Sequence, residues 1–352
     1  MRGLGFTRNE ALEAIAAAAA VAVSGTLVVA DAPAVARFIV TGITLALLAR
    51  LVGASTEQLG GRTGAAGAGV LQSALGNLPE FFIAIFALRD GLIGVVQAAL
   101  VGSILANSVL VLGLAFIAGG LRHGRQEFDS PYARILATLA VVAASILAVP
   151  TLAHAFHSPA AAHGKTLSLI CAGVLLAIFL LSLRGLLTGL PGEPDHDPPR
   201  WSLPTTIGVL ATSAVGAAFV SEWFVTALQP AIETFHMSEE FAGLVIVAIA
   251  GNAVENVVGV QLAAKNRPDF AISVIMNSSL QVALALTPVL VFVSLAFSTQ
   301  LTLVFPTLLA ISLLFAAALS TLVVYDGEST WAEGVILVGL YVALAASFWW
   351  GT

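Results

Sequence analysis

Long apolar runs recur along almost the whole chain of 352 residues, and each is long enough to cross a lipid bilayer as a helix. A hydrocarbon core about 30 Å thick needs about 20 consecutive apolar residues in helical form. Only 10% of the residues are charged, whereas a soluble domain carries about 25%. The sequence therefore predicts an all-α polytopic membrane protein.

We expect about eleven transmembrane helices, separated by turn signals rich in glycine, proline and aspartate. Their approximate ranges are 10–30, 35–56, 65–88, 91–119, 132–152, 165–189, 203–228, 240–264, 268–296, 299–323 and 330–350. Arg2 and Arg8 precede the first run, as they would in a signal peptide. Glu10 and Glu13 interrupt that charge pattern, and the run is long enough to remain as a helix, so we expect it to be retained.

Lysines and arginines test this order of helices. One side of the membrane would hold Arg2, Arg8, Arg50, Arg62, Arg122, Arg125, Arg134, Arg184, Arg200, Lys265 and Arg267, and the other only Arg37, Arg89 and Lys165. Because cytoplasmic loops carry the excess of basic residues, the N-terminus is expected in the cytoplasm. After eleven crossings the C-terminus would lie outside. The lack of long soluble extensions favours a multi-pass protein of the cell (inner) membrane.

Several classes of function are disfavoured by composition. The formal charge of −6 comes without a basic patch, so nucleic acid is not an expected partner. The single cysteine, Cys171, excludes an intrachain disulfide framework and a cysteine metal cluster. Tyr325-Asp326 resembles half of an aspartyl-protease pair, but no second half exists in the sequence, so no enzyme activity and no cofactor are expected.

Two short motifs place a carboxylate and an amide inside apolar segments. They are GNLPE at 76–80 and GNAVE at 251–255, offset by 175 residues. Ser103 and Ser278 keep the same offset, so the repeat extends beyond the motifs. An ionisable group within a membrane costs roughly 2.5–3.5 kcal/mol on insertion scales, and is therefore a functional candidate by default.

The repeat also predicts the organisation of the chain. Five crossings separate the two motifs, an odd number, so the two halves insert with opposite orientation. This is the inverted repeat of many secondary transporters, whose ion site lies near the membrane midplane where the repeats meet. We expect an extra N-terminal helix at 1–31, a first five-helix repeat at 32–190, a short acidic proline-rich linker at 191–202 and a second repeat at 203–352.

The residue types in the two motifs suit a hard cation. Asn77 and Glu80 are three residues apart and share a helical face, as do Asn252 and Glu255. Two carboxylates with amide and backbone oxygens form an all-oxygen site, which Ca²⁺ prefers, and two glutamates match a divalent charge. The alternative is a helix-packing motif, in which small residues and an asparagine join membrane helices. That alternative explains the asparagines but not the paired glutamates.

Further polar residues in or near the apolar spans are candidates for supporting the glutamates or lining an ion pathway. They could equally form interhelical hydrogen bonds. These residues are Gln72, Gln97, Ser103, Asn107, Glu222, Asn256, Ser278 and Gln281. His154, His157 and His163 cluster in one loop, where we expect a solvated turn rather than a metal site.

At these motifs the chain resembles the cation/proton exchanger (CAX) family of the calcium/cation antiporter superfamily. Residues 76–120 are similar to that family's first repeat and residues 251–289 to its second. The resemblance implies a secondary antiporter that exports Ca²⁺ from the cytoplasm in exchange for H⁺ by alternating access. It also implies that Glu80 and Glu255 bind the ion or protons. Asn77 and Asn252 would assist, and Gln97 and Gln281 would sit beside them.

The chain departs from this family at a few positions. Asn256 stands where the family commonly has histidine, Gln72 where it has asparagine, and Asn277 where it has glycine. The acidic helix that often joins the two halves is also missing. These differences leave the cation and the proton stoichiometry open. A Na⁺/Ca²⁺ exchanger and an antiporter for another divalent cation such as Mn²⁺ are the nearest alternatives, and an uncoupled cation channel is a more distant one.

Overall fold

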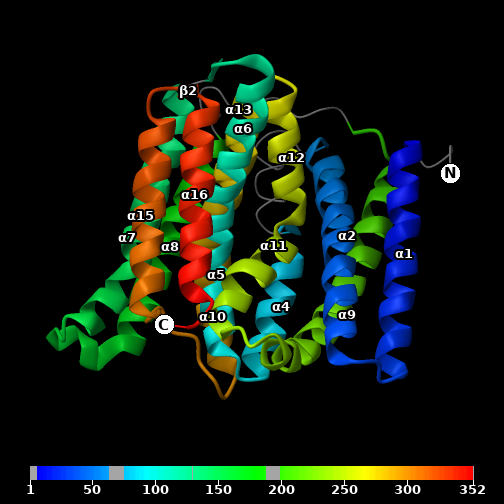
Figure 1. Cartoon of the computed structure of the whole chain (residues 1–352), viewed down its shortest axis with the longest axis horizontal. Coiled ribbons are helices and arrows are strands. Elements are labelled where there is room, and N and C mark those ends of the chain that lie inside the picture. Colours follow the sequence, from blue (N-terminus) through cyan, green and yellow to red (C-terminus); the bar gives the residue numbers. More distant parts are fainter. Residues whose placement is uncertain (1–5, 63–74, 129, 188–198, 352) are drawn as a thin grey trace.

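Long helices run side by side through the whole molecule (Figure 1). The computed structural model describes residues 6–62, 75–128, 130–187 and 199–351. Within these ranges, nine helices are long and apolar enough to cross a membrane, and a pair bent by 62° would make ten. The expected span at 65–88 begins outside the described residues, so the full count of eleven stays a prediction. The all-helical, multi-pass class is confirmed.

The helices follow the predicted spans closely, and most ends agree within a few residues. The first half contains α1 (Arg8–Val29), α2 (Ala34–Gly60), α4 (Leu78–Arg89), α5 (Ile93–Leu105), α6 (Leu112–His123), α7 (Ser130–Ala155) and α8 (Gly164–Leu187). The second half contains α9 (Leu203–Phe235), α10 (Glu239–Phe241), α11 (Ala248–Gly251), α12 (Ala253–Ala264), α13 (Pro268–Gln281), α14 (Thr287–Val293), α15 (Thr307–Val324) and α16 (Trp331–Phe348). Short helical turns of other types are η2 (Ala106–Val111), η3 (Pro159–His163), η4 (Ala242–Val247), η5 (Val282–Leu286) and η6 (Ser294–Ala296), and the strands β1 (Gln126–Glu127) and β2 (Glu328–Ser329) pair antiparallel.

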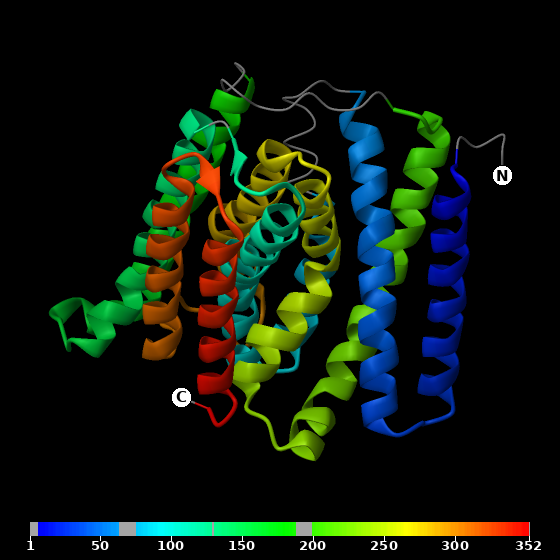
Figure 2. The same ribbon diagram turned by 45° about the horizontal axis from the view of Figure 1, so that its top comes forward.

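The two ends of the chain lie at opposite ends of the helix bundle (Figure 1). The N-terminal end is beside the top of α1, and the C-terminal end is beside the bottom of α16. An odd number of crossings produces this arrangement. Figure 2 shows α1, α2 and α9 as a group on one side of the molecule, with the remaining helices on the other.

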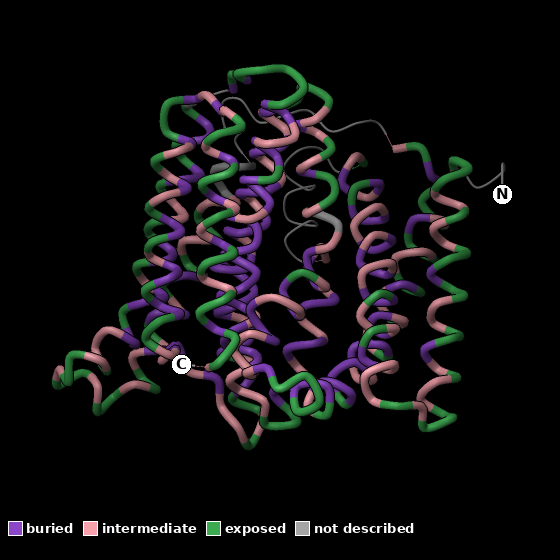
Figure 3. The backbone as a smooth tube through the Cα atoms, in the orientation of Figure 1, coloured by how far each residue is buried: buried purple, intermediate pink, exposed green. Residues whose placement is uncertain are grey.

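The continuous span α5–η2–α6 forms the centre of the bundle. In its most apolar stretch 83% of the residues are buried, against 11% in α1. Figure 3 shows this contrast as a buried centre and exposed outer helices. The outer helix α1 is nevertheless attached to α2 by polar contacts. The Ser24 and Thr44 hydroxyls lie 2.9 Å apart, and Arg50 forms an ion pair with Glu13 at 2.6 Å.

Two glycines allow α5 and η4 to cross with their backbones in contact. A Cβ atom on Gly102 would lie 2.4 Å from the Leu244 carbonyl oxygen, and one on Gly243 would lie 2.5 Å from that of Val95. No real side chain tolerates such distances, so both positions require glycine. The close crossing brings the second repeated motif, which follows η4 and α11, next to α5.

The expected span 299–323 is wrong at its start, because the helix begins only at Thr307. Residues 300–306 form no helix, and Pro306 at the helix boundary disfavours a helical conformation in the residue that precedes it. Side chains from other helices supply the hydrogen bonds that a helix would have made. Gln97 of α5 donates to the carbonyl oxygens of Thr302 at 2.9 Å and Val304 at 3.0 Å. Buried non-helical backbone is tolerated when the protein satisfies it in this way.

We expect Thr151→Val to destabilise the protein by about 1–3 kcal/mol, because it removes two hydrogen bonds from this buried segment. The Thr151 hydroxyl donates to the Leu303 carbonyl at 3.1 Å and accepts from the Phe305 amide at 2.9 Å. Thermal unfolding in detergent measures the effect. Thr138→Val is the matched control on α7, since that exposed hydroxyl bonds only within its own helix. Equal unfolding temperatures for the two variants would contradict this assignment.

Candidate functional site

Both repeated motifs place their asparagine directly before a helix. Asn77 precedes α4 with φ −94° and ψ 19°, and Asn252 precedes α12 with φ −96° and ψ 20°. Within the described part of the chain, neither side chain caps its own helix, so both amides are left for contacts with other helices. Glu80 and Glu255 occupy the first turns of α4 and α12. The partial positive charge of a helix N-terminus favours a carboxylate there.

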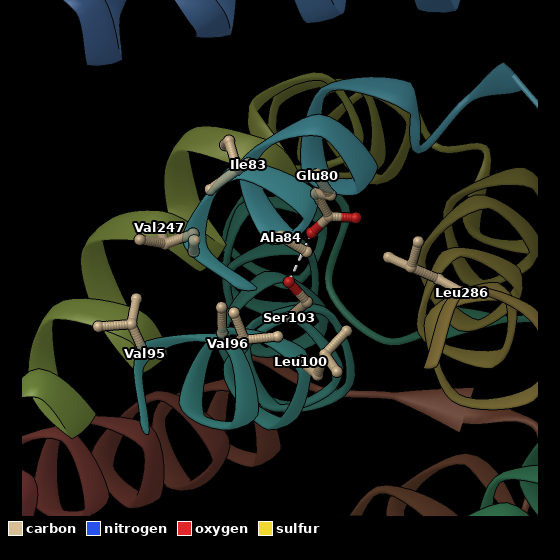
Figure 4. A pocket seen from close by; sticks show the side chains of 11 residues that line it. Glu80, Ile83, Ala84, Val95, Val96, Leu100, Ser103, Val247 and Leu286 are labelled. Atoms are coloured by element: carbon tan, nitrogen blue, oxygen red, sulfur yellow. Dashed lines mark hydrogen bonds between the residues drawn. The ribbon is translucent and has the colours of Figure 1, made fainter. Parts of the chain in front are cut away.

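Glu80 is buried between the two halves of the chain, with 7% of its surface exposed. Its Oε1 accepts hydrogen bonds from Ser103 Oγ at 2.5 Å and from Asn252 Nδ2 at 2.6 Å. Figure 4 shows the Glu80 and Ser103 side chains pointing toward each other. Because Ser103 belongs to the first half and Asn252 to the second, this carboxylate joins the two halves.

Asn252 is the branching point of a buried polar network. Its Nδ2 group also donates to Ser103 Oγ and to the Ala248 carbonyl, both at 2.9 Å. Its Oδ1 accepts from Asn107 Nδ2 at 3.0 Å, and that nitrogen also donates to Ser278 Oγ at 3.0 Å. Four polar residues expected from the sequence therefore meet around Glu80: Ser103, Asn107, Asn252 and Ser278.

Gly251 leaves the space that Glu80 occupies. A Cβ atom at this position would lie 2.4 Å from Cγ of Glu80 and 3.0 Å from its Oε1. The glutamate side chain therefore lies directly on the backbone of the second motif. The glycine that opens GNAVE is needed for the approach of the opposite carboxylate as well as for the helix break.

Asn77, the counterpart of Asn252 in the repeat, makes a longer and weaker hydrogen bond. Its Nδ2 lies 3.5 Å from Oε1 of Gln281, at the outer limit of a hydrogen bond. Gln281 stands at the end of α13, where the helix passes into η5. The contact brings the first motif against the second half of the chain.

A small cavity of about 20 Å³ extends from Glu80 between α4 and α5 (Figure 4). This is room for roughly one water molecule. Apart from Glu80 and Ser103 its lining is apolar, with Val96, Leu100 and Val247 among the residues that face it. A Ca²⁺ ion with six to eight oxygen ligands does not fit in a cavity of this volume.

Two predicted site residues, Gln97 and Glu222, bond to groups outside the network around Glu80. Gln97 donates to backbone carbonyls of the non-helical segment before α15. Glu222 pairs with Arg89 at 2.8 Å, and both side chains are more than a third exposed. This ion pair connects α9 to the end of α4, away from the buried network around Glu80.

The remaining predicted positions are described only in part. Asn256 lies half-buried in α12, and its backbone N–H donates to the Asn252 carbonyl at 3.0 Å. Gln72 lies outside the described residues. For Glu255 the helix position is described but the side chain is not, so the distance between its carboxylate and that of Glu80 stays a prediction.

Sequence reasoning missed the Ala248 carbonyl and the packing role of Gly251. Every residue has a backbone carbonyl whatever its side chain is, so the sequence could not identify the Ala248 carbonyl as an acceptor. Gly251 did carry a signal, because glycine stands at the same place in both motifs. The hydrogen bonds from Asn277 to Tyr132 and Ser273, at 3.0 and 3.2 Å, were not foreseen either.

The side chains around Glu80 are of the types that bind cations with a preference for oxygen ligands. Hydroxyl, amide and carboxylate oxygens are ligands for Ca²⁺ and similar ions, whereas softer metals use histidine or cysteine. In the parts of the chain that the structure describes, no three His, Cys, Asp or Glu side chains gather as a metal cluster.

Comparison with known families gives an independent view of the chain. Residues 33–187 and 205–350 match the family described as sodium/calcium exchanger protein. The chain is 33% identical over 324 residues to the Ca²⁺/H⁺ antiporter ChaA of Bacillus subtilis, covering 90% of this chain and 92% of that protein. It is 32% identical over 334 residues to a Ca²⁺/H⁺ antiporter of Synechocystis, covering 88% and 90%.

Solved structures match over nearly the whole chain. The structure of native YfkE superposes with a TM-score of 0.83 and 32% identity, covering 96% of this chain and 99% of that one. The structure of the H⁺/Ca²⁺ exchanger CAX gives a TM-score of 0.76 at 14% identity, covering 97% and 92%, and shows a shared fold.

Proposed function

Because this chain belongs to the sodium/calcium exchanger protein family, we propose that it is a secondary antiporter that exports Ca²⁺ from the cytoplasm in exchange for H⁺. The observation that carries this proposal is the buried carboxylate of Glu80, held by Ser103 from one half and Asn252 from the other. The relatives named Ca²⁺/H⁺ antiporter support the choice of ions, since the similarity extends over about nine-tenths of their length.

Glu80 and Glu255 together would hold either one Ca²⁺ ion or protons. Two neighbouring buried carboxylates titrate as a unit, and an uncompensated buried charge is costly. Either occupant neutralises the pair, and the neutral site is free to change the side it faces. An empty, charged site resists that change, which couples the two ions. Asn77 and Asn252 would assist the glutamates, with Ser103, Asn107, Ser278 and Gln281 in supporting roles.

The architecture we propose is an extra helix, α1, followed by two inverted five-helix repeats. Three observations support it: the family matches two separate stretches of the chain, Asn77 and Asn252 share one backbone conformation, and η2 and η5 occupy equivalent places in the two halves. The excess of basic residues at the end of the bundle near the N-terminus supports a cytoplasmic position for that end. The host membrane would be the cell membrane.

Ca²⁺ flux in proteoliposomes tests the proposal. Vesicles whose lumen is more acidic than the medium should accumulate Ca²⁺ as protons leave, and a protonophore should abolish the accumulation. An outward Na⁺ gradient without a pH gradient should drive no uptake, and uptake driven by Na⁺ would instead identify a Na⁺/Ca²⁺ exchanger. Equilibration without accumulation would indicate a channel. Excess Mn²⁺ in the medium shows whether other divalent cations share the site.

A further inference from the structure

Asn107 is a fully buried amide that contacts Asn252 at the start of η2. Its Nδ2 donates to Asn252 Oδ1 and to Ser278 Oγ. Among the described contacts its own Oδ1 has no hydrogen-bond partner. Leaving a buried acceptor unsatisfied is costly, so the amide is oriented for its two donated bonds. Asn107 therefore acts in this network as a donor.

The Ala248 carbonyl determines the orientation of the Asn252 side-chain amide. A backbone carbonyl can only accept a hydrogen bond, and the Ala248 carbonyl lies 2.9 Å from one terminal atom of Asn252, which must be the nitrogen. The other terminal atom is then the oxygen, and it requires a donor, which Asn107 supplies. The reverse orientation would set the oxygen of Asn252 against the Ala248 carbonyl and the nitrogen against the Asn107 nitrogen.

We propose that Asn107 is a positioning residue that keeps the nitrogen of Asn252 toward Glu80 and thereby weakens cation binding at this site. This inference rests on the proposed function. Ca²⁺ is bound by oxygen atoms, and an amide nitrogen beside Glu80 offers none. Asn252 presents its oxygen to a cation held by Glu80 only after a half-turn of the amide. That rotation breaks the hydrogen bond from Asn107.

The consequence is a built-in bias toward the cation-free arrangement. Ser103 and Asn252 both donate to Oε1 of Glu80 without a metal ion, and Asn107 stabilises this state through Asn252. A transporter must release its ion, so a site that opposes tight binding favours turnover. Removing the Asn107 donor should therefore tighten Ca²⁺ binding and slow its release.

Calorimetric titration of Ca²⁺ into the purified full-length protein at fixed pH tests the proposal. Asn107→Leu keeps the volume and removes the donor, and should lower the Ca²⁺ dissociation constant roughly three- to tenfold, the value of one net hydrogen bond. Asn107→Ser retains one hydroxyl donor and should give a smaller shift in the same direction. Asn277→Leu is the matched control, because that amide of α13 donates to Tyr132 and Ser273 instead. It should stay within about twofold of wild type.

The background variant Asn252→Ala separates positioning from a merely structural role. With no amide to orient, adding Asn107→Leu should leave the Ca²⁺ affinity unchanged. A persistent tightening there, or unchanged or weaker binding in both single Asn107 variants, would overturn the inference. If Asn107→Leu does not fold, Asn107→Ser alone decides between these outcomes. Wild-type protein that binds no Ca²⁺ would instead contradict the proposed function.

Discussion

Replacing Glu80 with glutamine is expected to abolish proton-driven Ca²⁺ uptake into inverted membrane vesicles. Glutamine has the same shape, and its oxygen can still accept from Ser103 and Asn252, so the fold should persist. It carries no charge for Ca²⁺ and does not exchange a proton. Removing one partner of a buried charged interaction costs about 3–5 kcal/mol, a loss of more than about a hundredfold. Glu255→Gln should have the same effect, because the two carboxylates are proposed to act as a pair.

Glu328→Gln is the matched control for this change. Glu328 lies in β2 at the surface of the bundle and pairs with Arg125. An exposed ion pair contributes little, about 0–1 kcal/mol, so uptake should remain near the wild-type rate. Both proteins must first be shown to reach the membrane in equal amounts. Normal pH-driven uptake by Glu80→Gln would refute the mechanism.

Gly251→Ala is expected to reduce the same uptake roughly ten- to a hundredfold, because overpacking of a buried site costs about 1–3 kcal/mol. The added methyl would lie 2.4 Å from Cγ of Glu80. The carboxylate must then move away from Ser103 and Asn252, and the two halves lose the contact made through Glu80. This single carbon atom should impair transport although it changes no polar group.

Gly208→Ala and Gly173→Ala are the controls for Gly251→Ala. Both glycines lie inside long helices, α9 and α8, and a Cβ atom at either place would meet nothing within 4 Å. Alanine also has the higher helix propensity, so both variants should transport and fold as well as wild type. Equal uptake by Gly251→Ala and these controls would show that Glu80 does not need its present position.

The helices could be predicted because their cause is local. An apolar run of sufficient length forms a helix in lipid whatever its neighbours are, and glycine and proline end it. The pairing of GNLPE with GNAVE was also expected, because the two motifs repeat at one offset, and their asparagines share one backbone conformation. The family and its Ca²⁺/H⁺ relatives agree with the resemblance that these motifs carry.

Contacts between the halves could not be predicted, because they depend on how helices cross. The sequence identified Ser103 and Asn107 as candidates, but it did not place Ser103 against Glu80 or Asn107 against Asn252. The close crossing at Gly102 and Gly243 decides these partners. The non-helical residues before α15 were also misassigned. Leu301, Leu303, Val304 and Phe305 form a short apolar run, and such a run does not by itself distinguish a helix from another conformation.

The non-helical segment 300–306 before α15 affects the order in which the protein assembles. The side chains that bond its backbone, Gln97, Thr151 and Ser168, come from three earlier helices, between 135 and 207 residues upstream. Until those helices are inserted and packed together, the backbone carbonyls and amides of this segment would lack hydrogen-bond partners inside the membrane. Each unsatisfied group there costs several kcal/mol. We therefore expect the segment to settle late, after the first half has already been assembled in the membrane. This segment would then fold after the helices that the ribosome synthesises before it.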